Sequence, residues 1–211
     1  YEEVGALLGE LNRRVKTRSI MISGAAETFA PMGEDKIDIF CRTLARRLIE
    51  QDYDIISGVG KGISGSIMIG AHEALSRPNM GRIGQRLRLF PFPYWMPDSP
   101  KRNEYYEANR KEMTSQGGIA IVIAGNKLDP HTGKIINSPG VATEVKLAKA
   151  AKQYVIPVGV TGHAAKELWE AASIDPKEWF FGIDAGTELA KLGDETLSPD
   201  QLVDAVFDLV S

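Results

Sequence analysis

The sequence predicts a Rossmann-like α/β fold, with a parallel sheet of about five or more strands flanked by helices on both faces. Two observations lead to this fold class. Short apolar runs alternate along the chain with segments of helical periodicity, which is typical of parallel strands joined by crossover helices. Glycine-rich segments follow several of the apolar runs, where strand-to-helix loops are expected. A length of 211 residues suits one sizeable core, so we predict a single domain over residues 1–211.

The predicted strands are the short apolar runs, and the predicted helices lie between or after them. The strands are expected at Ser19–Ser23, Asp54–Ser57, Leu87–Phe92, Ile119–Ala124 and Tyr154–Val160, and the helices at Asp35–Gln51, Ser64–Leu75 and Val141–Lys152. The only cysteine, Cys41, falls on the apolar face of the first of these helices and is interpreted as a core residue. A lone cysteine fits a reducing, cytoplasmic location.

Both ends of the chain have helical patterns. Apolar residues at helical spacing predict an amphipathic N-terminal helix over residues 1–17, which could pack on this domain, on a second copy or on an upstream domain. The chain begins with Tyr1, which fits a domain excised from a longer protein. Near the other end, Ser198 and Gln201 form a capping-box pattern around Pro199 that predicts a last helix. A cluster of aromatic residues before it, Trp169, Trp179, Phe180 and Phe181, is expected to form a second core.

Composition argues against several classes of function. A net charge of -3 disfavours a nucleic-acid binder that works by neutralising phosphates. No apolar run approaches the roughly 18 residues that a membrane span requires. The 3 histidines lie far apart and show no metal-ligand spacing, so no metal site is expected.

Two small-residue loops are predicted to hold phosphates. Ser23, Gly24 and Ala25 end the first strand, where backbone N–H groups can approach a ligand, although the segment could also be a tight strand exit. The segment Ser57–Ser66 follows the second strand, and its expected ligand-binding residues are Gly58, Val59, Gly60, Ser64 and Gly65. It does not match the Walker A spacing. Lys61 could be a solvated lysine or a ligand contact.

Two cations and one aromatic residue are further candidates. Arg110 precedes the fourth strand and has the planar fork that suits a phosphate, whereas Lys127 follows that strand and would act as a point charge. Either residue could instead be an ordinary surface cation. Phe92 lies in an aromatic and proline-rich stretch after the third strand, where it could form a wall against a base or ribose or pack a loop onto the core.

A third loop opens the helix after the fourth strand. In the segment Ser138-Pro139-Gly140-Val141-Ala142-Thr143-Glu144, Gly140 permits close approach and the free amides can receive an anion, so Ser138, Gly140 and Val141 are candidates. Glu144 could complement the helix dipole or bind ribose hydroxyls with its carboxylate.

Taken in order, these loops resemble the SLOG superfamily, which contains the LOG-type nucleotide phosphoribohydrolases. The resemblance covers roughly residues 19–160 and rests on Ser23–Ala25, the Ser57–Ser66 loop, Arg110-Lys111 and the Ser138–Glu144 segment. LOG enzymes carry Pro-Gly-Gly-x-Gly-Thr-x-x-Glu, with the glutamate and an upstream arginine in the catalytic site. This chain lacks two of those glycines, and its Glu144 directly follows Thr143. The altered loop, with Gly125-Asn126-Lys127, is closer to the STALD sensor domains of Thoeris-type anti-phage effectors.

The STALD resemblance implies a regulatory domain rather than an enzyme. Such a domain binds a cyclic ADP-ribose isomer and activates an attached NAD-consuming effector domain of sirtuin-like or TIR type. By analogy, Arg110 and Lys127 would meet the pyrophosphate and Glu144 the ribose hydroxyls. The resemblance implies no cofactor, and we expect a homo-oligomer without nucleic-acid or membrane partners. The alternative is a LOG-like enzyme that releases the base from a nucleoside 5'-monophosphate.

Overall fold

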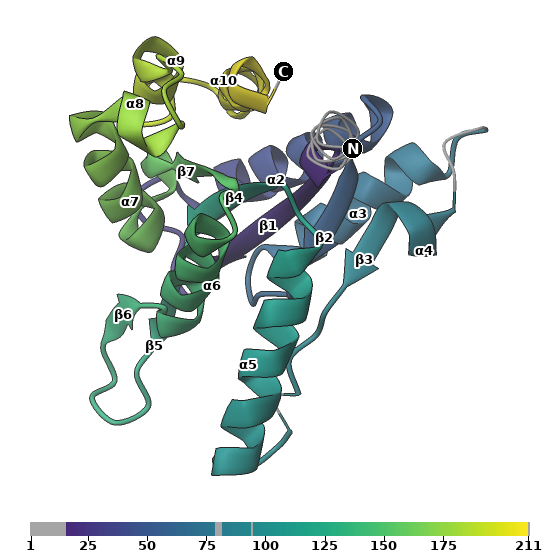
Figure 1. Cartoon of the computed structure of the whole chain (residues 1–211), viewed down its shortest axis with the longest axis vertical. Coiled ribbons are helices and arrows are strands. Elements are labelled where there is room, and N and C mark those ends of the chain that lie inside the picture. The colour runs from purple at the N-terminus through teal and green to yellow at the C-terminus, as the bar shows by residue number, and fades with distance from the viewer. Residues whose placement is uncertain (1–15, 79–81, 94, 211) are drawn as a thin grey trace, which may run out of the picture.

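A five-stranded parallel sheet forms the centre of the chain, with the strand order β3-β2-β1-β4-β7 (Figure 1). The computed structural model describes residues 16–78, 82–93 and 95–210. The strands are β1 (Ser19–Ala25), β2 (Asp54–Ser57), β3 (Leu87–Leu89), β4 (Ile119–Ala124) and β7 (Tyr154–Val158). A separate antiparallel hairpin pairs β5 (Asn126–Leu128) with β6 (Ile135–Asn137). The predicted fold class is confirmed.

Helices connect the strands and cover both faces of the sheet (Figure 1). The longer ones are α2 (Glu34–Glu50), α3 (Ser64–Leu75), α5 (Pro100–Ser115), α6 (Pro139–Ala150), α7 (His163–Ile174) and α10 (Pro199–Val210). The short ones are α4 (Ile83–Arg86), η1 (Gly159–Thr161), α8 (Pro176–Trp179) and α9 (Gly186–Lys191). The predicted capping box opens α10: the Ser198 N–H donates to Gln201 Oε1 at 2.9 Å, and the Gln201 N–H donates to Ser198 Oγ at 3.3 Å.

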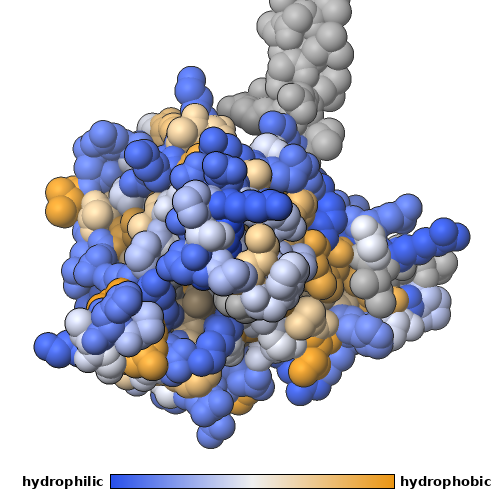
Figure 2. All heavy atoms as spheres, turned by 90° about the horizontal axis from the view of Figure 1, so that it is seen from below, coloured by the Kyte–Doolittle hydropathy of each residue, from blue (hydrophilic) through white to orange (hydrophobic). Residues whose placement is uncertain are grey.

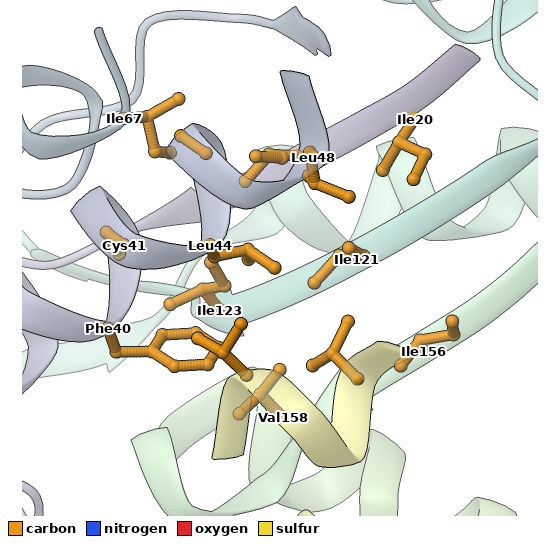
Figure 3. Packing of buried hydrophobic residues seen from close by; sticks show 14 of the residues in the cluster. Ile20, Phe40, Cys41, Leu44, Leu48, Ile67, Ile121, Ile123, Ile156 and Val158 are labelled. Carbon is orange, nitrogen blue, oxygen red and sulfur yellow. The ribbon is translucent and has the colours of Figure 1, made fainter. Parts of the chain in front are cut away.

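Alternate residues of the central strands face two different helical layers. Ile121 and Ile123 of β4 pack with α2, α3 and α10, and Cys41 lies buried in this layer as predicted (Figure 3). Ala120 and Val122 of the same strand pack with α5 and α6 on the other face. Since both faces are covered, the strand reads as a continuous apolar run, IAIVIA, which is the pattern of a buried parallel sheet.

Several boundaries differ from those predicted. The third strand ends at Leu89 instead of Phe92, because Pro91 and Pro93 lack the N–H groups that a strand needs for pairing. The last strand ends at Val158 and passes into η1. Helix α6 begins at Pro139 instead of Val141, since proline suits the first helical position.

The prediction that the aromatic residues near the C-terminus form a second core is wrong. Phe180 is buried in the same cluster as α2 and α10, and Trp169 packs against it. Phe181 is 52% exposed, with its ring 5.3 Å from that of Tyr154. The predicted N-terminal helix, apart from Lys16 and Thr17, lies outside the described residues.

The strand order determines where loops can form a site. Consecutive strands β1, β2 and β3 extend the sheet in one direction from β1, and β4 and β7 extend it in the other. At such a switch point the loops after β1 and β4 leave toward opposite faces, which opens a crevice at the carboxyl ends of these strands.

Candidate functional site

A cleft of about 330 Å³ lies at the carboxyl ends of the strands, beside the switch point between β1 and β4. Figure 2 views the molecule from this end, where α5 and the β5–β6 hairpin extend beyond the sheet. The lining of the cleft comes from six parts of the chain: the end of β1 with the loop after it, the loop after β2, the loop after β3, helix α5, the hairpin and the start of α6. The lining residues are Ile22, Gly24, Ala25, Glu27, Gly58, Gly60, Lys61, Phe92, Arg102, Tyr106, Arg110, Asn126, Lys127, Ser138, Gly140, Val141 and Glu144.

The end of β1, with the residue after it, and the loop after β2 form the inner wall and meet backbone to backbone. The Ala26 N–H donates to the carbonyl of Lys61 at 2.8 Å. A Cβ added to Gly60 would overlap the carbonyl oxygen of Gly24, and Gly62 has a φ of +82° against the carbonyl of Ala26. Glycine is required here for close approach, and at Gly62 for its conformation as well.

Glu144 lines the cleft from helix α6. It is 7% exposed and lies in the second turn of α6. Ser23 Oγ donates a hydrogen bond of 2.6 Å to Glu144 Oε2, and Arg110 Nε lies 3.5 Å from Glu144 Oε1. Burial raises the pKa of Glu144, and the hydrogen bond from Ser23 and the charge of Arg110 oppose that rise only in part. The carboxylate is therefore held in place but poorly solvated.

Arg110 lies against the first turn of α6. A Cβ on Gly140 would stand 2.8 Å from Arg110 Nη2, so only glycine leaves room for the guanidinium there without a shift. The guanidinium carbon is 4.8 Å from the ring centre of Phe92, a cation–π contact. Arg110 Nε is buried and makes no hydrogen bond within the protein. A cation at a helix N-terminus opposes the helix dipole, which favours an anion at the same place.

The β5–β6 hairpin brings Lys127 to the cleft and is fixed by Asn126. Asn126 is 1% exposed; its Oδ1 accepts the N–H groups of Glu27 and Thr28 at 2.9 and 3.0 Å, and its Nδ2 donates to the carbonyl of Thr28 at 2.9 Å. Glu27 in turn pairs with Lys61 at 2.6 Å. The loops after β1 and β2 are thus tied to the hairpin.

The structure brings most of the residues predicted from the sequence into one cleft. Those that line it are Gly24, Ala25, Gly58, Gly60, Phe92, Arg110, Lys127, Ser138, Gly140, Val141 and Glu144. Ser23 stands outside the lining and reaches the site through Glu144. Val59, Ser64 and Gly65 also lie outside it: Val59 has a φ of 57°, and the other two open α3. Ligand contact by these residues stays a prediction.

Sequence reasoning missed the contribution of α5, of Glu27 after β1 and of Asn126 at the start of β5. Arg102 and Tyr106 line the cleft together with Arg110, and so do Glu27 and Asn126. The spacing of four residues between Arg102, Tyr106 and Arg110 places them on one helix face, a signal that has meaning only once the helix is recognised.

Among the described residues, no group of three or more His, Cys, Asp and Glu side chains is placed to hold a metal ion. None of the described helices is both long and apolar enough to cross a membrane.

The strand order and the cleft define a Rossmann-like domain with a polar site, lined by glycine loops and cations, at its switch point. The chain belongs to the STALD family, the Sir2- and TIR-associating SLOG family, whose model matches residues 3–211.

Curated relatives carry the name NAD(+) hydrolase ThsA. The protein from Bacillus cereus (strain MSX-D12) is 30% identical over 213 residues, covering 100% of this chain and 43% of the relative. That from Acinetobacter baumannii (strain 532279) is 28% identical over 216 residues, covering 100% of this chain and 45% of the relative. The chain thus spans less than half the length of these relatives. The crystal structure of TM1055, a structural genomics target, superposes with a TM-score of 0.50 at 15% identity, covering 72% of this chain and 80% of that one, a likeness of fold alone.

Proposed function

We propose that this chain is the sensor domain of an anti-phage effector, that its cleft binds a cyclic ADP-ribose-type nucleotide, and that binding activates an attached NAD⁺-consuming domain. Membership of the STALD family and the name of the ThsA relatives support a regulatory role beside an NAD⁺ hydrolase. The relatives are more than twice as long as this chain, which leaves room for such a domain.

The observation that carries the proposal is the position of Arg110. Its guanidinium lies at the N-terminus of α6, has a buried Nε without a hydrogen bond, and is paired with a single carboxylate at 3.5 Å. A phosphate in the cleft would satisfy the guanidinium and the free amides of α6 together, because both favour the same anion. The site thus combines a side-chain cation with helix amides at one point, which is the chemistry that recognises a phosphate.

The remaining lining residues fit the other parts of such a ligand. The inner wall of Gly24, Gly58 and Gly60 lets phosphate oxygens approach the backbone, and Lys127 supplies a second positive charge from the hairpin. The Glu144 carboxylate accepts hydrogen bonds, which suits the hydroxyls of a ribose. We propose no cofactor for this domain besides the nucleotide ligand.

Signalling in this scheme proceeds through a change of assembly. A ligand shifts an equilibrium between two arrangements only if it prefers one of them. We propose that the domain works in the cytoplasm as a homo-oligomer, whose packing changes when the cleft is filled. Light scattering of the protein with and without saturating ligand tests this; identical assembly in both states, together with unchanged hydrolase activity of the full-length protein, contradicts it.

The proposed function is tested first by calorimetric titration with cyclic ADP-ribose isomers, ADP-ribose, NAD⁺ and AMP, followed by chromatography of each mixture. We expect a cyclic isomer to bind more tightly than the other compounds and to be recovered intact. An Arg110→Ala variant is expected to lose this binding, and Lys101→Ala, on the exposed part of α5, is expected to retain it. Binding of none of the compounds contradicts the proposed function.

A LOG-like phosphoribohydrolase is the second candidate, and the pairing of Glu144 with Arg110 favours it. LOG-type enzymes use a glutamate and an upstream arginine, and a buried carboxylate with a raised pKa is a reasonable general acid. This second function predicts free base and ribose 5-phosphate from AMP in the same titration mixtures. The release is expected to disappear in Glu144→Gln.

A further inference from the structure

Helix α5 carries a row of three side chains along the cleft. Arg102, Tyr106 and Arg110 follow one another at intervals of four residues and all line the cavity. With a rise of about 1.5 Å per residue, Arg102 lies on the order of 12 Å beyond Arg110 along the helix axis. Helix α5 extends past the carboxyl edge of the sheet (Figure 1), so this row leads outward from the glycine loops. The cleft therefore has an outer part, beside Arg102 and Tyr106, that lies beyond the glycine loops after β1 and β2.

The outer part is built from flat groups. The rings of Phe92 and Tyr106 meet edge to face, with centroids 5.0 Å apart. The guanidinium carbons of Arg102 and Arg110 both lie 5.6 Å from the centre of the Tyr106 ring. Aromatic rings and guanidinium planes are the surfaces on which nucleobases stack in proteins.

The position of Arg102 is not explained by the stability of the helix. It stands in the first turn of α5, which has no acidic residue, so its charge opposes the helix dipole. It contacts Asp98 at 2.5 Å and the carbonyl of Met96 at 3.5 Å, while its Nε is buried without a hydrogen bond. The guanidinium is thus held in orientation beside Tyr106, with hydrogen-bonding capacity left over.

We propose that Arg102 and Tyr106 form the base subsite of this cleft: Tyr106 holds the guanidinium of Arg102 against its ring, and that guanidinium offers its plane to the nucleobase. The inference rests on the proposed function, which places the phosphates near Arg110. A ligand that fills both parts must carry an aromatic base beyond its phosphates. Arg102 and Tyr106 are then specificity residues, which distinguish an adenine nucleotide from a sugar phosphate.

The test compares two probes by calorimetric titration, ADP-ribose and ribose 5-phosphate, of which only the first carries a base. Arg102→Ala and Tyr106→Ala are each expected to weaken ADP-ribose binding by about tenfold, in the range of base stacking, and to change ribose 5-phosphate binding less than about twofold. Arg110→Ala is expected to weaken the binding of both probes. Tyr106→Phe keeps the ring and is expected to bind ADP-ribose like the wild type.

Two controls separate ligand contact from loop structure. Lys101→Ala removes a neighbouring charge on the exposed surface, and Asp98→Asn removes the ion pair of Arg102 but keeps the guanidinium. Lys101→Ala is expected to bind ADP-ribose within about twofold of the wild type. Asp98→Asn, whose side-chain oxygen can still accept a hydrogen bond from Arg102, is expected to lose less affinity than Arg102→Ala. A loss in Asp98→Asn as large as in Arg102→Ala overturns the subsite, because Arg102 would then only hold the loop before α5.

Two further outcomes also overturn the inference. An equal loss for both probes in Arg102→Ala means that Arg102 contacts phosphate instead of a base. Normal ADP-ribose binding by Arg102→Ala and Tyr106→Ala removes the base subsite alone and leaves the proposed function standing. If the wild-type protein binds neither probe nor any cyclic isomer, the proposed function fails as well, so the two failures are distinguishable.

Discussion

The two walls of the cleft are built in different ways. The inner wall, formed by the end of β1 and the loop after β2, consists of backbone segments so close that Gly60 has no room for a Cβ beside the carbonyl of Gly24. The outer wall, formed by α5, α6 and the hairpin, consists of side chains such as Arg110, Lys127 and Glu144. Changes in the inner wall should therefore damage the fold, whereas changes in the outer wall should mainly alter binding. Substitutions in each wall test this division.

Gly60→Ala is expected to destabilise the domain by about 2 kcal/mol or more, because the added methyl group overlaps the carbonyl of Gly24 and forces the two loops apart. Chemical denaturation monitored by circular dichroism measures the change. Gly65→Ala is the matched control. Gly65 lies in the first turn of α3, and an added Cβ meets no other atom there, so this substitution is expected to leave stability unchanged or to increase it. Equal stability of the two variants would show that the inner wall can yield.

Ser23→Ala is expected to destabilise the domain by about 1–3 kcal/mol, although Ser23 lies outside the cleft. Its hydroxyl donates to the buried carboxylate of Glu144, which would lose that hydrogen bond. Introduced into a Glu144→Gln protein, Ser23→Ala should cost less stability than it costs in the wild type, because residue 144 then carries no charge that needs the hydrogen bond. Additive effects of the two changes would contradict a direct interaction.

Lys127→Ala is expected to weaken ligand binding by about tenfold, or about 1.4 kcal/mol, with no change in the denaturation midpoint. Lys134→Ala is the control, since Lys134 is exposed beyond β5 on the same hairpin and does not line the cleft. Calorimetric titration of both variants with the best-binding cyclic isomer measures their affinities. A similar loss in both would mean that the hairpin acts only through its overall charge.

The smallest effect concerns pH. Burial raises the pKa of Glu144 above its ordinary value of 4.5, so its charged form is less favourable in the folded state than in the unfolded chain. The group's contribution to stability is therefore fully present below pH 4.5 and is lost as the pH rises through the raised pKa. Glu144→Gln should lack this decline, so its stability relative to the wild type increases as the pH rises from 4.5 through the raised pKa. Parallel stability curves would contradict a raised pKa.

The sheet could be predicted from the sequence because its strands are buried on both faces, so that β4 reads as an unbroken apolar run. Helix α5 could not, since it faces the cleft and solvent: only Met113 and Thr114 are buried along it, and no apolar stripe marks it. The hairpin was missed because each of its strands is three residues long, too short for an alternating pattern to be recognised.

The residues of the candidate site also fall into those that the sequence predicts and those that it does not. The inner wall could be predicted because glycine has a strong local signature after a strand, as in the Ser57–Ser66 loop. Arg102 and Tyr106 have no such signature, since their helix was not recognised. The pairing of Ser23 with Glu144 joins two positions 121 residues apart, which no local pattern reveals.

That long separation has a consequence for how the site comes into being. Residues from β1, α5 and α6 must all be in place before Ser23, Arg110 and Glu144 meet, so the cleft cannot exist in a partly folded chain. Any molecule that occupies the cleft binds only the native state and therefore increases the free energy of unfolding by RT ln(1 + [L]/Kd). The melting temperature of the whole domain rises as a result. A library of unlabelled metabolites can therefore be screened by thermal denaturation alone, even before the natural ligand has been identified.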